Sequence, residues 1–285
     1  MPNTLPNFSF RNKVREAIYI RRDNVKSKFH DYIFSLDMKS IAYPFVENLG
    51  IKCPKLFYKN EKLENIQIND IDGSFVLKPE QAHSSLGVYL CHNEHGNYHE
   101  LLTNRTVSKQ QIIEEAFSIM KEKKFSNKWM LEELVYPDDG KLYALDDWKF
   151  YCFYGEVGLI LQKHKGIDGE ITYKLYDESL VEAKNTGKYI GKIDSNLPLA
   201  RNVRKMLDAA RKLSSNVPLP FVRVDLFSSS EGVIFGEFTP FPGGFSMFWK
   251  AWDEKLGKMW MDAEARLDRD IKNGCFQEKY KSIGN

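Results

Sequence analysis

The stretch FVRVDLFSSSEGVIFGEFTPFPGG, residues 221–244, predicts two strands joined by a polar turn and followed by a loop rich in Pro and Gly. Alternate side chains of a strand face the same side, so Arg223 shares a face with Asp225. Glu237 shares a face of the second strand with Thr239 in the same way. Turning back at SSSEG places Asp225 roughly opposite Glu237, with Cβ atoms about 5 Å apart. Two carboxylates that close repel unless a proton or a cation intervenes, and Mg²⁺ accepts such oxygen ligands.

The same hairpin also has a purely structural interpretation. In that interpretation Arg223 and Asp225 form an ion pair while Glu237 faces solvent, and the hairpin alone favours it because same-strand charges are common. The TPFPGGFS loop after Glu237 shifts the balance towards a binding site. Pro and Gly continue a strand poorly and let backbone approach a ligand closely.

A second candidate site lies at Lys78. The segment SFVLKP, residues 74–79, predicts a strand that ends near this lysine, and the small and polar residues QAHSSLG follow it. Backbone N–H groups and the hydroxyls of Ser84 and Ser85 can cradle a phosphate in such a loop. The spacing is not that of a Walker A motif. In isolation, an ordinary hairpin loop with a lysine reaching solvent explains this segment better.

The third candidate is the strand WMLEELV, residues 129–135, together with the later DDWKF. Glu132 and Glu133 fall on opposite faces of this otherwise apolar strand. A strand running into a hinge can present main-chain donors and acceptors to an adenine, while Asp147 can bind a ribose hydroxyl. Taken alone, a half-exposed strand edge with one glutamate in water is the better explanation.

The remaining pattern predicts an α+β chain with antiparallel hairpins and two or three lobes. Residues 108–121 fit an amphipathic helix, and Ser108 with Gln111 makes a capping box. The N-terminal 36 residues, basic and aromatic, predict a solvated helix covering a flank, or else an arm that touches an anionic partner. Further predicted segments are a helix at 36–50, a hairpin at 148–154 and 157–163, a mobile segment at 163–174, a helix at 199–213 and a polar helix ending near 272.

Composition excludes several classes of protein. The chain has 285 residues, 42% of them hydrophobic, which is typical of globular proteins and enough for one large domain or two to three small ones. Its 41 Lys and Arg against 39 Asp and Glu give a net charge of +2, which offers no argument for general nucleic-acid binding. The four cysteines are far apart and lack a CxxC pair, and the six histidines include no zinc-like spacing. With no signal-peptide or membrane-spanning stretch, we expect a reducing cytoplasm.

The order of the three candidate sites resembles the ATP-grasp superfamily. The run KPEQAHSSLGV, residues 78–88, is similar to the lysine and glycine/serine loop of its D-alanine–D-alanine ligase type members, and RVDLF…GEFTPFPG is similar to their metal-binding segment. The resemblance is sharper for the teichuronopeptide-biosynthesis, or TupA-like, branch. It rests on FVLKP, DDWKFYCFYGEVGLI, PFVRVDLF and IFGEFTPFPGG, and covers roughly residues 37–260.

This resemblance implies an ATP-grasp fold, in which two α+β lobes with antiparallel sheets enclose a nucleotide cleft. The first lobe is short for that plan. The implied division is a short N-terminal lobe at 1–72, a central lobe with phosphate loop and hinge at 73–145, and a C-terminal lobe with the metal site at 146–285.

The resemblance also implies roles for individual residues. Arg223 would stabilise charge on the transferred phosphoryl group, and Lys163, in preference to Lys165 or Lys174, would reach the γ-phosphate. Asp225 and Glu237 would bind Mg²⁺, with Thr239 where many ATP-grasp enzymes have an asparagine ligand. The implied ATP-binding residues are Lys39, Lys78, Ser84, Ser85, Gly87, Glu132, Glu133, Val135, Asp147 and Lys149.

The implied activity is ATP- and Mg²⁺-dependent joining of a carboxylate to an amine through an acyl phosphate. In this branch the acceptor would be a uronic acid or acidic group of a surface polysaccharide or its precursor, and the donor an amino acid or amine. The expected location is the cytoplasm, with peripheral contact to membrane-linked glycan assembly. Two alternatives remain: a kinase that phosphorylates a sugar hydroxyl, and a non-catalytic nucleotide- or carbohydrate-binding protein.

Overall fold

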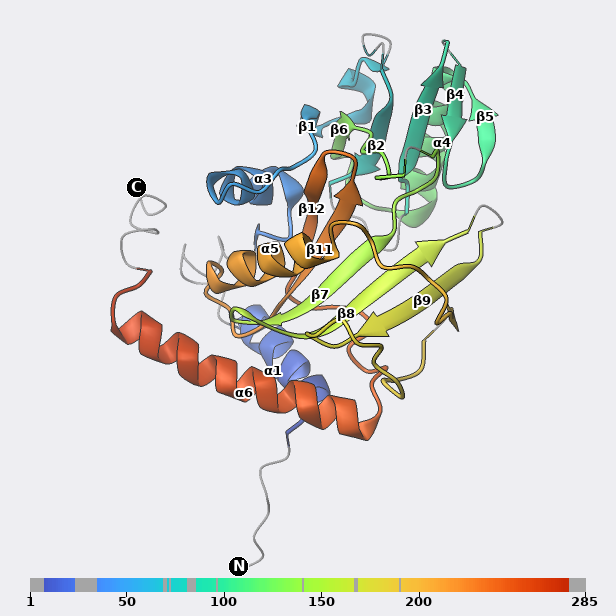
Figure 1. Ribbon diagram of the computed structural model, residues 1–285. Helices are drawn as coiled ribbons and strands as arrows, with labels where there is room; N and C mark the ends of the chain where they lie inside the picture. Colours follow the sequence, from blue (N-terminus) through green and yellow to red (C-terminus); the bar gives the residue numbers. More distant parts are fainter. Residues whose placement is uncertain are drawn as a thin grey trace, which may run out of the picture.

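Two antiparallel-rich sheets, one above the other in Figure 1, make up most of the protein. This computed structural model describes residues 8–276 except 24–34, 69–70, 72, 81–85, 96, 140, 167–168 and 190. Each sheet has six strands, and helices are distributed over both of them, so the predicted α+β class is confirmed. No helix in the described part of the chain is long and apolar enough to span a membrane.

The first sheet has the strand order β1-β6-β2-β3-β4-β5 and is antiparallel throughout. Helix α4 (Lys109–Lys123) covers one face, where Ile112 and Ala116 pack against Leu77 and Leu131. The predicted capping box begins this helix, because Ser108 accepts from the Gln111 N–H and Gln111 accepts from the Ser108 N–H. The strands are β1 (Leu56–Glu61), β2 (Phe75–Pro79), β3 (Tyr89–Glu94), β4 (Asn97–Glu100), β5 (Arg105–Val107) and β6 (Trp129–Glu133), with a 3₁₀ turn η1 at Leu63–Asn65.

The second sheet has the order β10-β9-β8-β7-β11-β12, and only the short β10–β9 contact is parallel. One face packs on helix α5 (Val203–Ser215), whose apolar side includes Met206, Ala210 and Leu213. The strands are β7 (Asp147–Phe153), β8 (Glu156–Lys165), β9 (Ile171–Tyr176), β10 (Lys192–Ile193), β11 (Val222–Ser229) and β12 (Gly232–Thr239).

Residues 163–174, which the sequence predicts to be mobile, include the end of strand β8 and the beginning of strand β9. The end of β8 pairs with β9, and Lys163 lies opposite Tyr173. The alternating ITYKLY run suits a pleated strand. The preceding β7–β8 hairpin turns at Tyr154 and Gly155, both with positive φ, as two-residue hairpin loops require.

Helix α3 (Lys39–Asn48) lies where the two sheets meet (Figure 1). Its buried Tyr43 and Val46 belong to the same apolar cluster as Phe235 and Phe238 of β12 and Met130 of β6. The N-terminal segment is therefore shared between the sheets: α3 packs on β12, whereas β1 joins the first sheet. The division into lobes at 72 and 145 stays a prediction.

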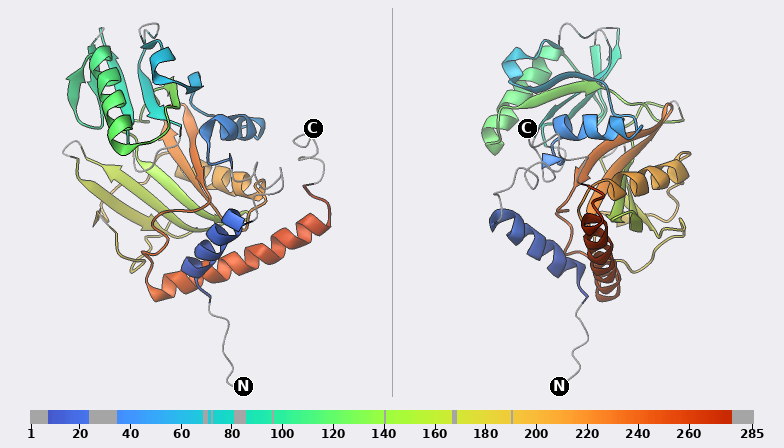
Figure 2. Two further views of the ribbon diagram at one scale, coloured as in Figure 1. Left: turned by 180° about the vertical axis from the view of Figure 1, so that it is seen from behind. Right: turned by 90° about the vertical axis from the view of Figure 1, so that its left-hand side faces the viewer.

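The two terminal helices, α1 (Phe10–Asp23) and α6 (Lys250–Lys272), pack on each other below the second sheet, as both views of Figure 2 show. Phe10 is completely buried and makes edge-on ring contacts with Phe221 and Trp260. The predicted N-terminal helix is thus present, and it covers the face of the sheet opposite α5.

Gly257 of α6 allows this close packing because it has no side chain. Even a substitution by alanine should therefore destabilise the fold. A Cβ at this position would lie 2.5 Å from the Ser9 nitrogen and 2.8 Å from the Phe10 nitrogen, both backbone atoms that cannot move aside alone. We expect Gly257→Ala to lower the free energy of unfolding by about 1–3 kcal/mol through overpacking. Urea unfolding followed by circular dichroism measures this. Gly73→Ala, where a Cβ would meet no atom within 4 Å, is the control, and equal midpoints for both variants would contradict the expectation.

Candidate active site

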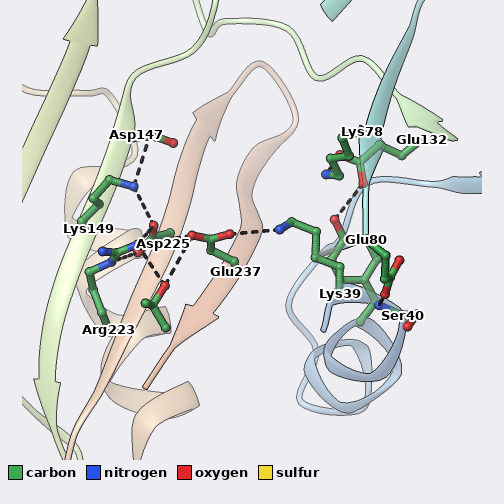
Figure 3. A network of polar contacts seen from close by, with 12 residues as sticks. Lys39, Ser40, Lys78, Glu80, Glu132, Asp147, Lys149, Arg223, Asp225 and Glu237 are labelled. Atoms are coloured by element: carbon green, nitrogen blue, oxygen red, sulfur yellow. Dashed lines mark hydrogen bonds and ion pairs between the residues drawn. The ribbon is translucent and has the colours of Figure 1, made fainter. Parts of the chain in front are cut away.

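One row of residues across the second sheet gathers its charges. Lys149 of β7 lies opposite Asp225 of β11, and Asp225 lies opposite Glu237 of β12, the pairing that strand alternation predicts. Arg223 and Thr239 form the neighbouring pair on the same face. Three strands thereby place two carboxylates and two cations side by side (Figure 3).

Asp225 is the buried centre of this row, with only 2% of its surface exposed. The Arg223 guanidinium donates to both carboxylate oxygens, from Nε to Oδ1 at 2.6 Å and from Nη2 to Oδ2 at 2.7 Å. The Lys149 Nζ donates to Oδ2 at 2.6 Å. Burial alone would lower the pKa of Arg223, but the Asp225 carboxylate outweighs it and raises that pKa further. The Asp225 carboxylate is therefore held between two cations, Arg223 and Lys149.

Glu237 is the more accessible carboxylate, with 37% of its side chain exposed. Its Oε2 accepts from Lys39 Nζ at 2.9 Å and its Oε1 from Arg223 Nη2 at 3.2 Å. The Thr239 hydroxyl donates to Oε1 at 3.4 Å. Burial favours the protonated form, but Lys39, Arg223 and Lys149 outweigh it and hold the pKa of Glu237 well below its usual range.

Lys78 and Glu132 form a second, buried ion pair on neighbouring strands of the first sheet. The Tyr43 hydroxyl donates to the other Glu132 oxygen at 2.8 Å. Burial, followed by repulsion from Lys39, lowers the pKa of Lys78 despite the neighbouring Glu132. Glu132 was expected to belong to an adenine hinge, and the structure shows its side chain holding the predicted phosphate lysine.

The remaining hinge residues, Glu133 and Val135, are not among those that line a hollow of about 700 Å³ at Ser74, His92 and Tyr136. Glu133 pairs with Lys55: its N–H donates to the Lys55 carbonyl, and its carboxylate accepts from the Lys55 N–H. Val135 is half-buried just after β6. His92 Nδ1 lies 3.1 Å from the Tyr136 hydroxyl. The sequence did not predict this contact, because the histidines were considered only as zinc ligands and their spacing did not fit a zinc site.

Among the other residues predicted from the sequence, Asp147 and Lys163 lie near the charged row of the second sheet, and Gly87 lies in a turn after β2. Asp147 Oδ2 lies 3.3 Å from Lys149 Nζ and 4.0 Å from Lys163 Nζ. Asp147 and Lys163 therefore border the charged row to which Lys149 belongs. Gly87 is buried in a left-handed turn, where a Cβ would meet Pro79 at 3.1 Å. Ser84 and Ser85 lie outside the described residues.

The three candidate γ-phosphate lysines differ in what they contact. Lys165 donates to the Leu102 carbonyl and Lys174 to the Leu197 carbonyl, both at 2.8 Å. Lys163 instead borders Asp147 on the face that carries the carboxylate row. This placement supports the choice of Lys163, whose catalytic role stays a prediction.

Sequence reasoning also missed Tyr43 and Glu80. Tyr43 follows Lys39 by four residues, one helical turn, so the helix periodicity contained a signal that it shares a face with the lysine. Glu80 comes directly after Lys78-Pro79, but the pattern gave no sign that its carboxylate reaches Ser40 of α3.

The carboxylate pair fits a magnesium ion by its chemistry. Two carboxylates supply hard oxygen ligands, and Mg²⁺ in proteins commonly takes one or two of them together with substrate phosphates. In the described residues, no three His, Cys, Asp or Glu side chains gather as a metal-binding group. Asp225 and Glu237 are the proposed acidic ligands, and the part of Thr239 stays a prediction.

Comparison with known proteins identifies the class of fold. The D-alanine–D-alanine ligase of Bacillus anthracis superposes with a TM-score of 0.50 at 14% identity, over 83% of this chain and 69% of that one, which shows the ATP-grasp fold. The family model described as TupA-like ATP-grasp matches residues 17–261. The chain belongs to the TupA-like ATP-grasp family, and the resemblance inferred from sequence is confirmed.

Other solved structures are similar at lower TM-scores. The Helicobacter pylori D-alanine–D-alanine ligase matches with a TM-score of 0.44 and 18% identity over 79% of this chain. The ATP-grasp ligase PsnB, complexed with a precursor variant, Mg and ADP, matches with a TM-score of 0.44 and 12% identity over 82% of this chain. The Bacillus anthracis ligase has also been solved with ATP. The match covers 61% of the Helicobacter pylori chain and 59% of the PsnB chain, less than two thirds of either. No curated protein matches the sequence.

Proposed function

We propose that this protein is an ATP-dependent ligase that joins a carboxylate to an amine through an acyl phosphate. The observation that carries the proposal is the pair of facing charge clusters in an ATP-grasp fold: Lys39 and Lys78 on one side, Asp225 and Glu237 on the other. Lysines suit phosphate groups and paired carboxylates suit a metal–nucleotide complex. The ATP and Mg²⁺ requirement is part of this proposal.

The chemistry proceeds in two balanced steps. An oxygen of the substrate carboxylate attacks the γ-phosphorus of ATP, the bond to the β–γ bridging oxygen breaks, and ADP leaves. The amine nitrogen then attacks the acyl carbon and loses a proton, the C–O bond to phosphate breaks, and an amide and inorganic phosphate result. Mg²⁺ held by Asp225 and Glu237 would neutralise phosphate charge.

The chain's own residues act by positioning and charge neutralisation. Lys39 and Lys78 would bind phosphate oxygens, and Arg223, fixed by Asp225, would face the charge that develops on the transferred group. Lys39 contacts Glu237 and Lys78 contacts Glu132, so binding of ATP requires the lysines to exchange these carboxylates for phosphate. Lys149 belongs to the charged row and Asp147 borders it, where a ribose or an α-phosphate would lie.

The finer proposal concerns the substrates. We propose a uronic acid or another acidic group of a surface polysaccharide or its precursor as acceptor, and an amino acid or amine as donor, because the TupA-like branch carries that expectation. The reaction would take place in the cytoplasm, where ATP is available, in contact with membrane-linked glycan assembly.

An isotope experiment tests the ligase reaction. We expect purified protein with Mg·ATP, glucuronic or galacturonic acid labelled with ¹⁸O in the carboxylate, and a panel of amino acids to yield ADP, amide and phosphate. One ¹⁸O should appear in the phosphate, because the carboxylate oxygen stays with phosphorus when the amine displaces it. Mass spectrometry of both products measures this.

Three results would contradict the ligase proposal. A phosphorylated sugar formed without an amine would indicate the kinase. Nucleotide binding with no turnover across the panel would favour the non-catalytic alternative. An amide formed with unlabelled phosphate would exclude the acyl phosphate.

A further inference from the structure

Helix α3 begins without a cap from its own sequence. The first four N–H groups of a helix lack partners inside the helix, and the side chain of Met38, the N-cap residue, does not cap them. The missing acceptor comes from elsewhere in the chain: Glu80 Oε1 accepts from the Ser40 N–H at 3.2 Å. A carboxylate at a helix N-terminus is also favoured by the helix dipole.

Glu80 is buried, and its carboxylate accepts one hydrogen bond among the described residues, the one from the Ser40 N–H. It is 6% exposed, and its second oxygen, Oε2, is buried without a hydrogen-bond partner among the described residues. A buried carboxylate oxygen without a partner is unfavourable, so its retention calls for an explanation. The main chain at Glu80 is itself held, because its N–H donates to the Lys128 carbonyl at 2.8 Å.

The position of this contact links the two proposed phosphate lysines. Glu80 follows Lys78 by two residues, and Ser40 follows Lys39 directly. One hydrogen bond thus joins the segment that carries Lys78 to the helix that carries Lys39, as the labelled residues of Figure 3 show. The lysine side chains then extend to different partners, Glu237 and Glu132.

We propose that Glu80 is a positioning residue that fixes Lys39 relative to Lys78, so that both ammonium groups reach the polyphosphate of one nucleotide. This inference rests on the proposed function, in which the two lysines bind ATP. Glu80 acts through α3 and does not itself contact the nucleotide. Its role depends on the reach and acceptor oxygen of the side chain, and its charge is secondary.

Three variants separate geometry from charge. Glu80→Ala removes the acceptor, Glu80→Asp keeps the charge but shortens the side chain, and Glu80→Gln keeps an acceptor oxygen at the same reach. The probe is the non-hydrolysable analogue AMP-PNP with Mg²⁺, followed by isothermal titration calorimetry. We expect the Ala and Asp variants to bind about tenfold more weakly, the order of effect of losing one helix cap, and the Gln variant to stay within about twofold of wild type.

A matched control and a double variant exclude a general loss of structure. Glu100 is another buried glutamate of the first sheet, and its carboxylate accepts from the Leu102 and Thr103 N–H groups. Glu100→Ala should lower the unfolding midpoint without changing nucleotide affinity. Glu80→Ala should weaken binding no further when Lys39→Met is already present, because the two changes remove the same interaction.

The outcomes distinguish this inference from the proposed function. If wild-type protein fails to bind Mg·AMP-PNP, the proposed function is wrong and the inference falls with it. If wild type binds and the Ala and Asp variants bind as tightly, the role of Glu80 alone is overturned. A Gln variant as weak as the Ala variant would overturn it too, because charge would then decide. If the Ala variant does not fold, the Asp and Gln comparison decides the question.

Discussion

Replacing Asp225 with asparagine should lower the free energy of unfolding by about 3–5 kcal/mol, because removing one partner of a buried ionic cluster leaves the others uncompensated. Asp225 is 2% exposed and receives hydrogen bonds from both Arg223 and Lys149. An asparagine side chain has no negative charge and only one acceptor oxygen, so two buried cations would lose the carboxylate they share and keep only the longer contacts, Arg223 with Glu237 at 3.2 Å and Lys149 with Asp147 at 3.3 Å. The same change removes a proposed Mg²⁺ ligand.

Urea unfolding followed by circular dichroism and tryptophan fluorescence measures this effect. The control is Asp208→Asn, an aspartate whose side chain is 77% exposed and which pairs with Arg211 one helical turn away. Exposed pairs contribute little, so the control should change stability by about 0.5 kcal/mol or less. If the Asp225 variant unfolds at the same urea concentration as the control, the buried cluster does not stabilise the fold as described.

Replacing Glu237 with glutamine should have its main effect on function. We expect Mg²⁺-dependent nucleotide turnover to fall by about 10²–10³-fold, the usual effect of removing one electrostatic contact from a transition state. The loss of stability should be smaller than for Asp225→Asn, because 37% of the Glu237 side chain is exposed and Gln keeps its volume. AMP-PNP affinity measured as a function of Mg²⁺ concentration should lose its Mg²⁺ dependence.

Acidification gives this variant a second readout. The pKa of Glu237 lies well below its usual range because Lys39, Arg223 and Lys149 outweigh the effect of burial. The stability from this carboxylate is therefore complete above the ordinary glutamate pKa of about 4.3, and is lost as the pH falls through the lower folded value. The free energies of unfolding of wild type and the Gln variant should therefore differ most above about pH 4.3. They should converge as the pH falls through the lower pKa of Glu237 in the folded protein.

Glu231→Gln is the control for both measurements. Glu231 lies in the turn of the same β11–β12 hairpin, and its side chain is 70% exposed beside Lys52. It should change neither the Mg²⁺ dependence nor the acid sensitivity. A Glu237 variant with wild-type Mg²⁺ dependence would remove Glu237 from the proposed metal site.

Local patterns predicted the parts of the site that depend on one hairpin. The alternation in residues 221–239 was enough to place Asp225 opposite Glu237, and the register agrees. The neighbour on the other side, Lys149 of β7, could not be placed in the same way, because strand order within a sheet is set by packing between distant segments. Lys39 reaches Glu237 across 198 positions of sequence, a contact that no periodicity contains.

The roles of single side chains were harder to predict than their strands. The strand WMLEELV was recognised, yet the sequence suggested main-chain contacts for its glutamates, whereas Glu132 is paired with Lys78 and Tyr43. A buried charge needs a partner, but sequence alone does not say which one. The net charge of +2 could not reveal the site either, because a sum over the whole chain does not show that the site's positive side chains lie beside its carboxylates.

The packing of α1 against α6 has a consequence for how the chain reaches this structure during synthesis. Phe10 is synthesised long before Phe221 and Trp260, which its ring contacts in the folded protein. The first sheet, formed by residues 56–133, has no such dependence and can assemble while translation continues. Helix α1 therefore reaches its final packing only after β11 and α6 have been made, although it precedes both sheets in the sequence, and until then its apolar face stays available to chaperones.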